Sequence, residues 1–146
     1  MPQSNKYLQF SLGGAVFLLP GSASLTIDTR DSLATNGAER TKVCAWRTEG
    51  SERWPAYALD RNLRVSHGEH WERAIFLPAS PHPVGLAARD VQLLPGGEFE
   101  AVPFTPIGPA PTRAGHLFNA AWVRETEVTL IFDPNALAVF LLSLGA

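Results

Sequence analysis

Short runs of apolar residues, alternating or continuous, recur along the chain between turn residues. Tyr7–Leu12 alternates polar and apolar positions, the pattern of a half-buried strand. Gly13-Gly14 and the apolar run Ala15–Leu19 follow, which predicts a hairpin. Further strands are predicted at Leu25–Asp28, Lys42–Trp46, Trp54–Leu59, Arg73–Leu77, Val84–Ala88, Val91–Leu94 and Val128–Phe132. Many short strands at this spacing are typical of an all-β sandwich or a pair of small barrels.

Only the C-terminal segment has the pattern of a helix. Asp133 is a good N-cap and Pro134 suits the first helical position, while Asn135–Leu144 is apolar on almost all sides. Gly145 is able to end the helix. A helix that is apolar all round must be buried against the strands or against a partner.

The segment Pro103–Pro111 holds four prolines in nine residues, with Phe104 and Ile107 between them. Proline at this density excludes a packed helix. We interpret the segment as an extended connector that carries two apolar anchors.

The composition narrows the function classes. The chain has 146 residues, 45% of them hydrophobic, which is material for one domain with a substantial core. A net charge of −2 does not favour a nucleic-acid partner. The single cysteine, Cys44, favours a reducing compartment. We expect no signal peptide, and the longest apolar run, Ala136–Leu142, is far below the ~20 residues that span a bilayer. These features predict a cytoplasmic protein without membrane insertion.

The chemically active residue types do not form a recognisable catalytic pattern. His67 and His70 stand close together on a polar loop, but a metal would need a third ligand from elsewhere. The acidic residues within Asp60–Glu72 have no spacing that sets them at a fixed separation. Cys44 lies in an apolar run, typical of a buried thiol. We therefore predict no catalytic site, no bound metal and no cofactor.

The tryptophans are more informative, because three of them stand beside arginines in or near predicted strands: Trp46, Trp54 and Trp71, with Arg47, Arg53 and Arg73. Such pairs occur on base-stacking platforms of oligonucleotide-binding barrels. They are also the usual hot spots of protein interfaces. The net charge and the lack of a basic cluster favour the protein interface, and some of the tryptophans are also expected to fill the core.

The order of these elements resembles the CheW-like domain, the adaptor module of bacterial chemosensory arrays. Tyr7–Leu12, the glycine pair and Val16–Pro20 resemble the opening hairpin of the family. Trp54–Leu59 is similar to its V-P-V-I-D-L strand, with Pro55 and Leu59 retained.

The later motifs follow in the same order as in the family. Arg73–Leu77 and Pro83–Val91 resemble the hairpin that reads r-V-G-L-l-V-D-r-V. The proline-rich connector, Gly115–Val123 and Thr129–Asp133 with the terminal helix resemble the closing segment. The similarity covers nearly the whole chain.

The resemblance implies a single domain over residues 1–146, made of two SH3-like five-stranded β-barrels that share a hydrophobic core. It implies no catalytic activity. The partners would be the CheW-like regulatory domain of a histidine kinase and the cytoplasmic tip of a chemoreceptor.

The chain departs from the family at several polar positions. The Asn-Leu-Arg-Gly turn reads Ala45-Trp46-Arg47-Thr48, so that Arg47 matches the family's arginine while Asn and Gly are replaced. Ala58 stands for the Asp of the I-D-L motif, and the acidic position of the third strand falls near Thr26. These departures indicate a divergent adaptor, for which we hypothesise a pilus or surface-motility pathway.

The predicted partner contacts combine the resemblance with the exposed aromatic and apolar candidates: Arg47, Trp46, Trp54, Pro55, Phe104 and Ile107. The alternative is a small ligand- or nucleic-acid-binding β-barrel with a different partner, with a metal at His67 and His70. Zinc content and salt-sensitive oligonucleotide binding distinguish it from the adaptor.

Overall fold

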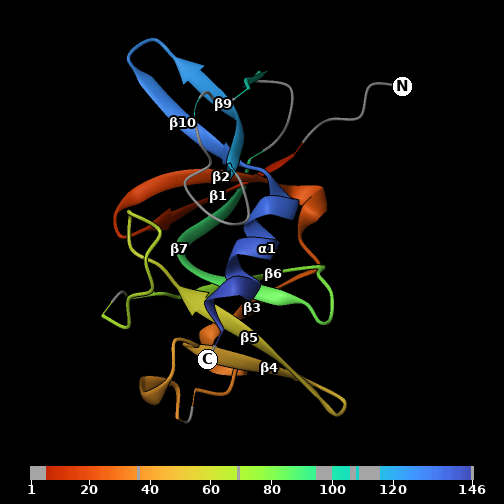
Figure 1. The fold of residues 1–146 in the computed structure, drawn as a ribbon. Coiled ribbons are helices and arrows are strands. Elements are labelled where there is room, and N and C mark those ends of the chain that lie inside the picture. Colours follow the sequence, from red (N-terminus) through yellow and green to blue (C-terminus); the bar gives the residue numbers. More distant parts are fainter. Residues whose placement is uncertain are drawn as a thin grey trace.

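The computed structural model describes residues 6–35, 37–68, 70–94, 100–105, 108 and 116–145. Within these residues it is mainly β, with one α-helix near the C-terminus (Figure 1). The strands are β1 (Tyr7–Leu12), β2 (Ala15–Pro20), β3 (Thr26–Thr29), β4 (Ala45–Glu49), β5 (Glu52–Ala58), β6 (Arg73–Leu77), β7 (Val84–Leu94), β8 (Ala101–Pro103), β9 (Phe118–Arg124) and β10 (Glu127–Phe132). The helix is α1 (Pro134–Leu144), and three short 3₁₀ turns are η1 (Gly21–Ala23), η2 (Arg30–Ser32) and η3 (Ala38–Arg40).

Strand β7 divides the molecule into two lobes. Its first half pairs with β5 and β6, and its second half pairs with β1 after a register shift. Asp90 lies near this shift with φ of 52°, a left-handed backbone conformation. We call β1, β2 and β8–β10 the N–C lobe, and β3–β6 the central lobe. The predicted separate strands Val84–Ala88 and Val91–Leu94 are therefore wrong in one respect, because the chain continues through Arg89 and Asp90 as one strand.

The sheet formed by the described strands is open. Its order is β3-β6-β7-β1-β2-β10-β9-β8, with β5 joined to β7 and β4 joined to β5. The mainly β class is confirmed. Pairing among the described strands does not close the sheet, although Ala34, which follows β3 and η2, forms a two-hydrogen-bond backbone bridge to Trp46 on β4.

Most predicted strands are confirmed, and two kinds of error remain. The predicted Lys42–Trp46 is displaced to β4, because the Thr41 hydroxyl binds both the N–H and the C=O of Val43 and holds that segment out of regular pairing. Strands β8 and β9 were not among the predicted strands, because Ala101–Pro103 is too short for an alternating pattern and Phe118–Arg124 does not alternate regularly between polar and apolar residues. Pro103 therefore belongs to a strand, not to the connector.

Two hydrophobic clusters flank the central strands. The main core cluster draws residues from both lobes and from α1, among them Phe10, Phe132, Tyr57, Ile75 and Leu137. The alanine cluster lies on the other side of β5–β7 and consists of Leu33, Cys44, Ala45, Ala56, Ala58, Trp71, Ala74, Phe76 and Ala87. The central strands are thus buried on both faces, as their apolar runs require.

The terminal helix docks on the main core cluster. Asp133 caps it, since its Oδ1 accepts a hydrogen bond from the backbone N–H of Asn135 at 3.1 Å. Leu137 and Leu141 are fully buried, whereas Val139 is 54% exposed. The predicted burial against the strands is confirmed for the face of α1 that carries Leu137 and Leu141, whereas the face that carries Val139 is exposed in the single chain.

Candidate functional site

The β4–β5 hairpin divides the predicted contact residues between its two faces. Arg47 lies opposite Trp54, and Trp46 lies opposite Pro55. Directly opposed residues share a face and neighbours alternate, so Arg47 and Trp54 lie on one face and Trp46 and Pro55 on the other. Trp54 packs against the alanine cluster, while Trp46 packs against the main core cluster. The structure therefore makes two sites from residues that the sequence groups together.

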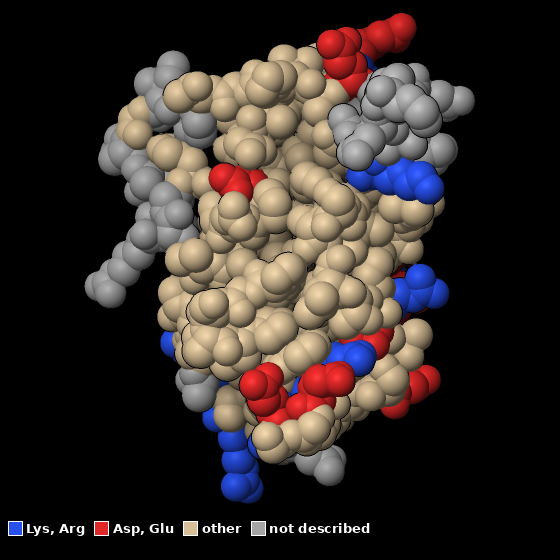
Figure 2. Space-filling view, turned by 90° about the vertical axis from the view of Figure 1, so that its right-hand side faces the viewer, with Lys and Arg blue, Asp and Glu red and all other residues tan. Residues whose placement is uncertain are grey.

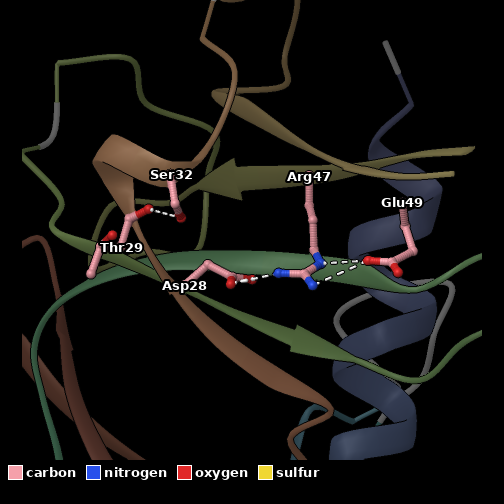
Figure 3. Close-up of polar contacts among 5 residues, drawn as sticks. All are labelled: Asp28, Thr29, Ser32, Arg47 and Glu49. Atoms are coloured by element: carbon pink, nitrogen blue, oxygen red, sulfur yellow. Dashed lines mark hydrogen bonds and ion pairs between the residues drawn. The ribbon is translucent and has the colours of Figure 1, made fainter.

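Arg47 connects the two edge strands of the central lobe. Its Nη1 lies 2.6 Å from Oδ1 of Asp28 on β3, and its Nη2 lies 3.1 Å from Oε2 of Glu49 (Figure 3). Strands β3 and β4 each pair with only one neighbour among the described strands, and not with each other. The Arg47–Asp28 pair, which we call the latch, spans the side between these strands, where the backbone of Ala34 also bridges to Trp46. The guanidinium carbon also lies 5.6 Å from the Trp54 ring centroid.

The latch couples a partly exposed cation to a mostly buried anion. The side chain of Arg47 is 30% exposed and that of Asp28 only 14%. The hydrogen bond to Asp28 raises the pKa of Arg47, which stays charged. Within the described part of the chain, the buried Oδ2 of Asp28 has no hydrogen-bond partner. Loss of Arg47 would leave this carboxylate uncompensated, so the arginine has a structural role as well as an accessible surface.

Asp28 is the residue of this site that sequence reasoning missed. The acidic position of the third strand was assigned near Thr26, two residues earlier, where the structure has a threonine. Thr26 and Asp28 lie on the same side of β3, since side chains alternate along a strand. The signal available in the sequence was the two-residue period of a strand, which places Asp28 on the same face as Thr26.

A pocket of about 300 Å³ opens on the other face of the hairpin, between β5 and the end of α1. It is lined by Val43, Trp46, Arg53, Pro55, Tyr57, His82, Leu142 and Gly145. The Tyr57 hydroxyl donates a hydrogen bond to the Gly145 carbonyl at 2.9 Å, and burial raises the pKa of Tyr57. The guanidinium of Arg53 stacks over the Trp46 ring, 4.4 Å from its centroid. Arg53 and Tyr57 were not among the predicted contacts.

A third surface lies on the β9–β10 hairpin, which projects from the body of the molecule (Figure 1). Val123 and Val128 are directly opposed and are 55% and 63% exposed. Val102 on the adjacent β8 is 47% exposed and lies on the same face, because it is opposite Ala121, two residues before Val123. We call these three valines the hairpin patch. Phe104, which follows β8, is 39% exposed.

The remaining candidates occupy different settings. Ile107, the second predicted anchor of the connector, lies outside the described residues, as does Glu69 of the His67–His70 loop. His67 and His70 are exposed. Across the described ranges, no three His, Cys, Asp or Glu side chains gather closely enough to hold a metal ion. None of the helices in those ranges has the length and apolar character to cross a membrane.

Two residues that looked chemically interesting in sequence are core residues. Trp71 is only 4% exposed and is covered by the guanidinium of Arg30 at 4.7 Å. Cys44 is buried, and desolvation raises its pKa to about 12. A thiol with this pKa remains protonated and is a poor nucleophile at neutral pH.

Comparison with known proteins finds similarity at the level of the fold. No family model matches the chain, and no curated protein matches it. Among solved structures, the crystal structure of the scaffolding protein TtCheW from Thermoanaerobacter tengcongensis is similar, with a TM-score of 0.58 and 13% sequence identity. The similarity covers 91% of this chain and 86% of that chain. The chain therefore has a CheW-like fold, which the order of its sequence motifs also indicates.

Proposed function

We propose that this protein is a non-enzymatic chemosensory adaptor, which couples a receptor to a histidine kinase through protein contacts. The observation that carries the proposal is the similarity to a CheW scaffolding protein over 91% of the chain. The proposed partners are the regulatory domain of the kinase and the cytoplasmic tip of the receptor. The proposed setting is the cytoplasm, in a pilus or surface-motility pathway, with residues 1–146 acting as one domain.

The surfaces of the molecule suit binding more than catalysis. The hairpin patch exposes three valines on a projecting hairpin, and such contiguous apolar surface is typical of interaction sites. Phe104 adds an aromatic group near the same end of the sheet, and Ile107 of the connector remains a predicted contact. These residues form the first proposed contact surface.

The second proposed contact surface is the latch face, with Arg47 and Trp54 as its centre. Arginine and tryptophan dominate the energetics of protein interfaces, and here they stack on each other. The exposed Ile27 lies on the opposite face of β3 from Asp28 and does not belong to this surface. An approaching partner would meet the partly exposed arginine, with Asp28 and Glu49 holding it in place.

The experiment is a pull-down of the tagged protein from its own cell lysate, read by mass spectrometry. We expect recovery of a chemosensory histidine kinase or a receptor. A folded protein that recovers neither, and instead binds a single-stranded oligonucleotide in a salt-dependent manner, would overturn the adaptor proposal in favour of the nucleic-acid alternative.

A double variant tests whether the latch face takes part. Asp28→Ala with Arg47→Ala removes both charges together, so that no buried carboxylate is left unpaired. We expect this variant to keep its fold and to lose captured partner. Unchanged capture by the double variant would remove Arg47 from the contact surface and leave it a structural residue.

A further inference from the structure

The pocket beside Trp46 has an unbalanced charge. Among the described residues, its ionisable side chains are Arg53, Tyr57 and His82, and none of the described lining residues carries a carboxylate. In the described part of the chain, Arg53 forms no ion pair, whereas Arg47 across the hairpin contacts two carboxylates. The carboxylate nearest in sequence, Glu52, lies on the opposite face and accepts a hydrogen bond from Nε1 of Trp54 at 3.0 Å. Arg53 is exposed, and its guanidinium is accessible to an anion from outside.

The apolar part of the lining provides an anchor site. Val43, Trp46, Pro55 and Leu142 surround a volume of about 300 Å³, which is the lower limit of ordinary ligand pockets. A space of this size accommodates a single large side chain better than an extended organic molecule. The Tyr57 hydroxyl already donates a hydrogen bond to the Gly145 carbonyl. Arg53, whose guanidinium lies over the Trp46 ring, is therefore the group available for polar recognition. Tryptophan, tyrosine and arginine are the residue types enriched in interface hot spots, and all three line this pocket.

The size and the lining of the pocket favour a protein segment as the occupant. Figure 2 views the molecule from the side to which the β6–β7 turn points, the turn that carries His82. The central area of this face is mostly uncharged, an acidic group lies toward its upper left, and acidic and basic side chains gather on its lower part. An extended segment can lie across such a surface and insert one side chain.

We propose that this pocket binds an acidic segment of a protein partner, which inserts one apolar side chain between Trp46, Pro55 and Leu142 and places a carboxylate on Arg53. The inference rests on the proposed function only in that the occupant belongs to a protein partner. It assigns Trp46 and Pro55 to a site different from the latch face. Because a carboxylate on a guanidinium forms a charge-assisted hydrogen bond, the contact is specific for acidic sequences.

The test uses short peptides and the intact protein, observed by ¹H–¹⁵N correlation spectra with the tryptophan indole signals assigned. The probes are acetyl-Gly-Asp-Phe-Asp-Gly-amide, its neutral match with both Asp replaced by Asn, and its anchor-free match with Phe replaced by Ala. We expect the acidic Phe peptide to shift the Trp46 indole signal in a saturable manner. The neutral and the anchor-free peptides should bind about tenfold more weakly.

Variants of two arginines separate the pocket from general charge attraction. Arg53→Gln should weaken the acidic peptide about tenfold, whereas Arg64→Gln, which removes the same charge from an exposed position outside the pocket, should leave binding unchanged. The spectra of the variants report their folding directly.

Equal binding of the acidic and neutral peptides to the wild type would overturn the proposal without any variant. So would the absence of a shift at Trp46, or equal losses in the two arginine variants. These outcomes are separate from the lysate experiment: capture of a kinase or receptor without peptide binding refutes only the pocket. Peptide binding without such capture refutes the proposed adaptor function and leaves the pocket proposal standing.

Discussion

The two hydrophobic clusters of this protein are filled by side chains of very different size. The main core cluster contains a group of phenylalanine rings, with Phe118 and Phe132 4.6 Å apart and Phe10 stacked on Phe132 at 6.0 Å. The alanine cluster has five alanines together with Leu33, Cys44, Trp71 and the fully buried Phe76. Strands β5–β7 separate the two clusters, with large residues such as Tyr57 and Ile75 on one face and alanines on the other.

The difference separates the two arginine–tryptophan pairs of the β4–β5 hairpin. Arg47 and Trp54 lie on the face of the alanine cluster, where Arg47 also meets Asp28. Arg53 and Trp46 lie on the face of the main core cluster. Arg124 stacks on Trp122 in β9, so such pairs occur in both lobes.

The largest expected effect is in the phenylalanine group. Phe132→Ala should lower the free energy of unfolding by about 3 to 5 kcal/mol, because its ring is fully buried against Phe10, Phe17 and Phe118. Urea denaturation measures the change. Val128→Ala on the same strand is the control, and at 63% exposure it should cost less than about 0.5 kcal/mol. Similar losses in both variants would contradict the assignment of the core.

Cys44 reports how tightly the alanine cluster is closed. Burial raises its pKa to about 12, so at about pH 8 its reaction with a disulfide reagent should be at least about a hundredfold slower in the folded protein than in guanidinium chloride. The thiol of the unfolded chain ionises near pH 8.5, so folding stability should fall as the pH rises above about 9. Equal labelling rates in the two states would show that the cluster opens readily.

Gly85 tests the close approach of strands in the central lobe. A Cβ added there would lie 2.8 Å from Cε1 of Phe76 and 3.0 Å from Cβ of Ala56. Gly85→Ala should therefore cost about 1 to 3 kcal/mol by overpacking, measured by the same denaturation experiment. Gly68→Ala is the matched control, because no atom lies nearer than 4.0 Å to its added Cβ. A neutral Gly85→Ala would indicate a looser lobe than described.

The smallest effect is expected at the latch. In a double-mutant cycle with Asp28→Asn and Arg47→Met, the coupling free energy of folding should be about 1 kcal/mol, because the pair is partly screened by solvent. Each single variant should also destabilise the central lobe, as monitored by the labelling rate of Cys44. Strictly additive losses would show that the contact between β3 and β4 contributes nothing to stability.

The fold was predictable from sequence to the extent that local patterns dictate it. Tyr7–Leu12 and Arg73–Leu77 form strands with the predicted bounds, and Asp133 caps the helix as expected. Strands β8 and β9 escaped prediction, because β8 has only three residues and the two are held by pairing with each other and with β10. Such pairing leaves no local signal.

The candidate site was only partly predictable. The sequence marked Arg47, Trp46, Trp54 and Pro55 because of their residue types, but it treated them as one group. The register of β4 with β5 sends them to two faces, and it introduces Arg53 as the arginine that stacks on Trp46. Register depends on long-range packing, since a slip of one residue reverses every side chain.

Hydrophobic periodicity, turn residues and helix caps are local properties, and they determined the mainly β class, the opening hairpin and the terminal helix of this protein. The sequence by itself also determined which residue types were available for binding. The tertiary structure alone decided that Asp28 meets Arg47 between β3 and β4 of the central lobe, and that Trp46 shares a pocket with the end of α1. Those contacts join residues that lie far apart along the chain, and the free energy that selects them comes from burying both clusters at once.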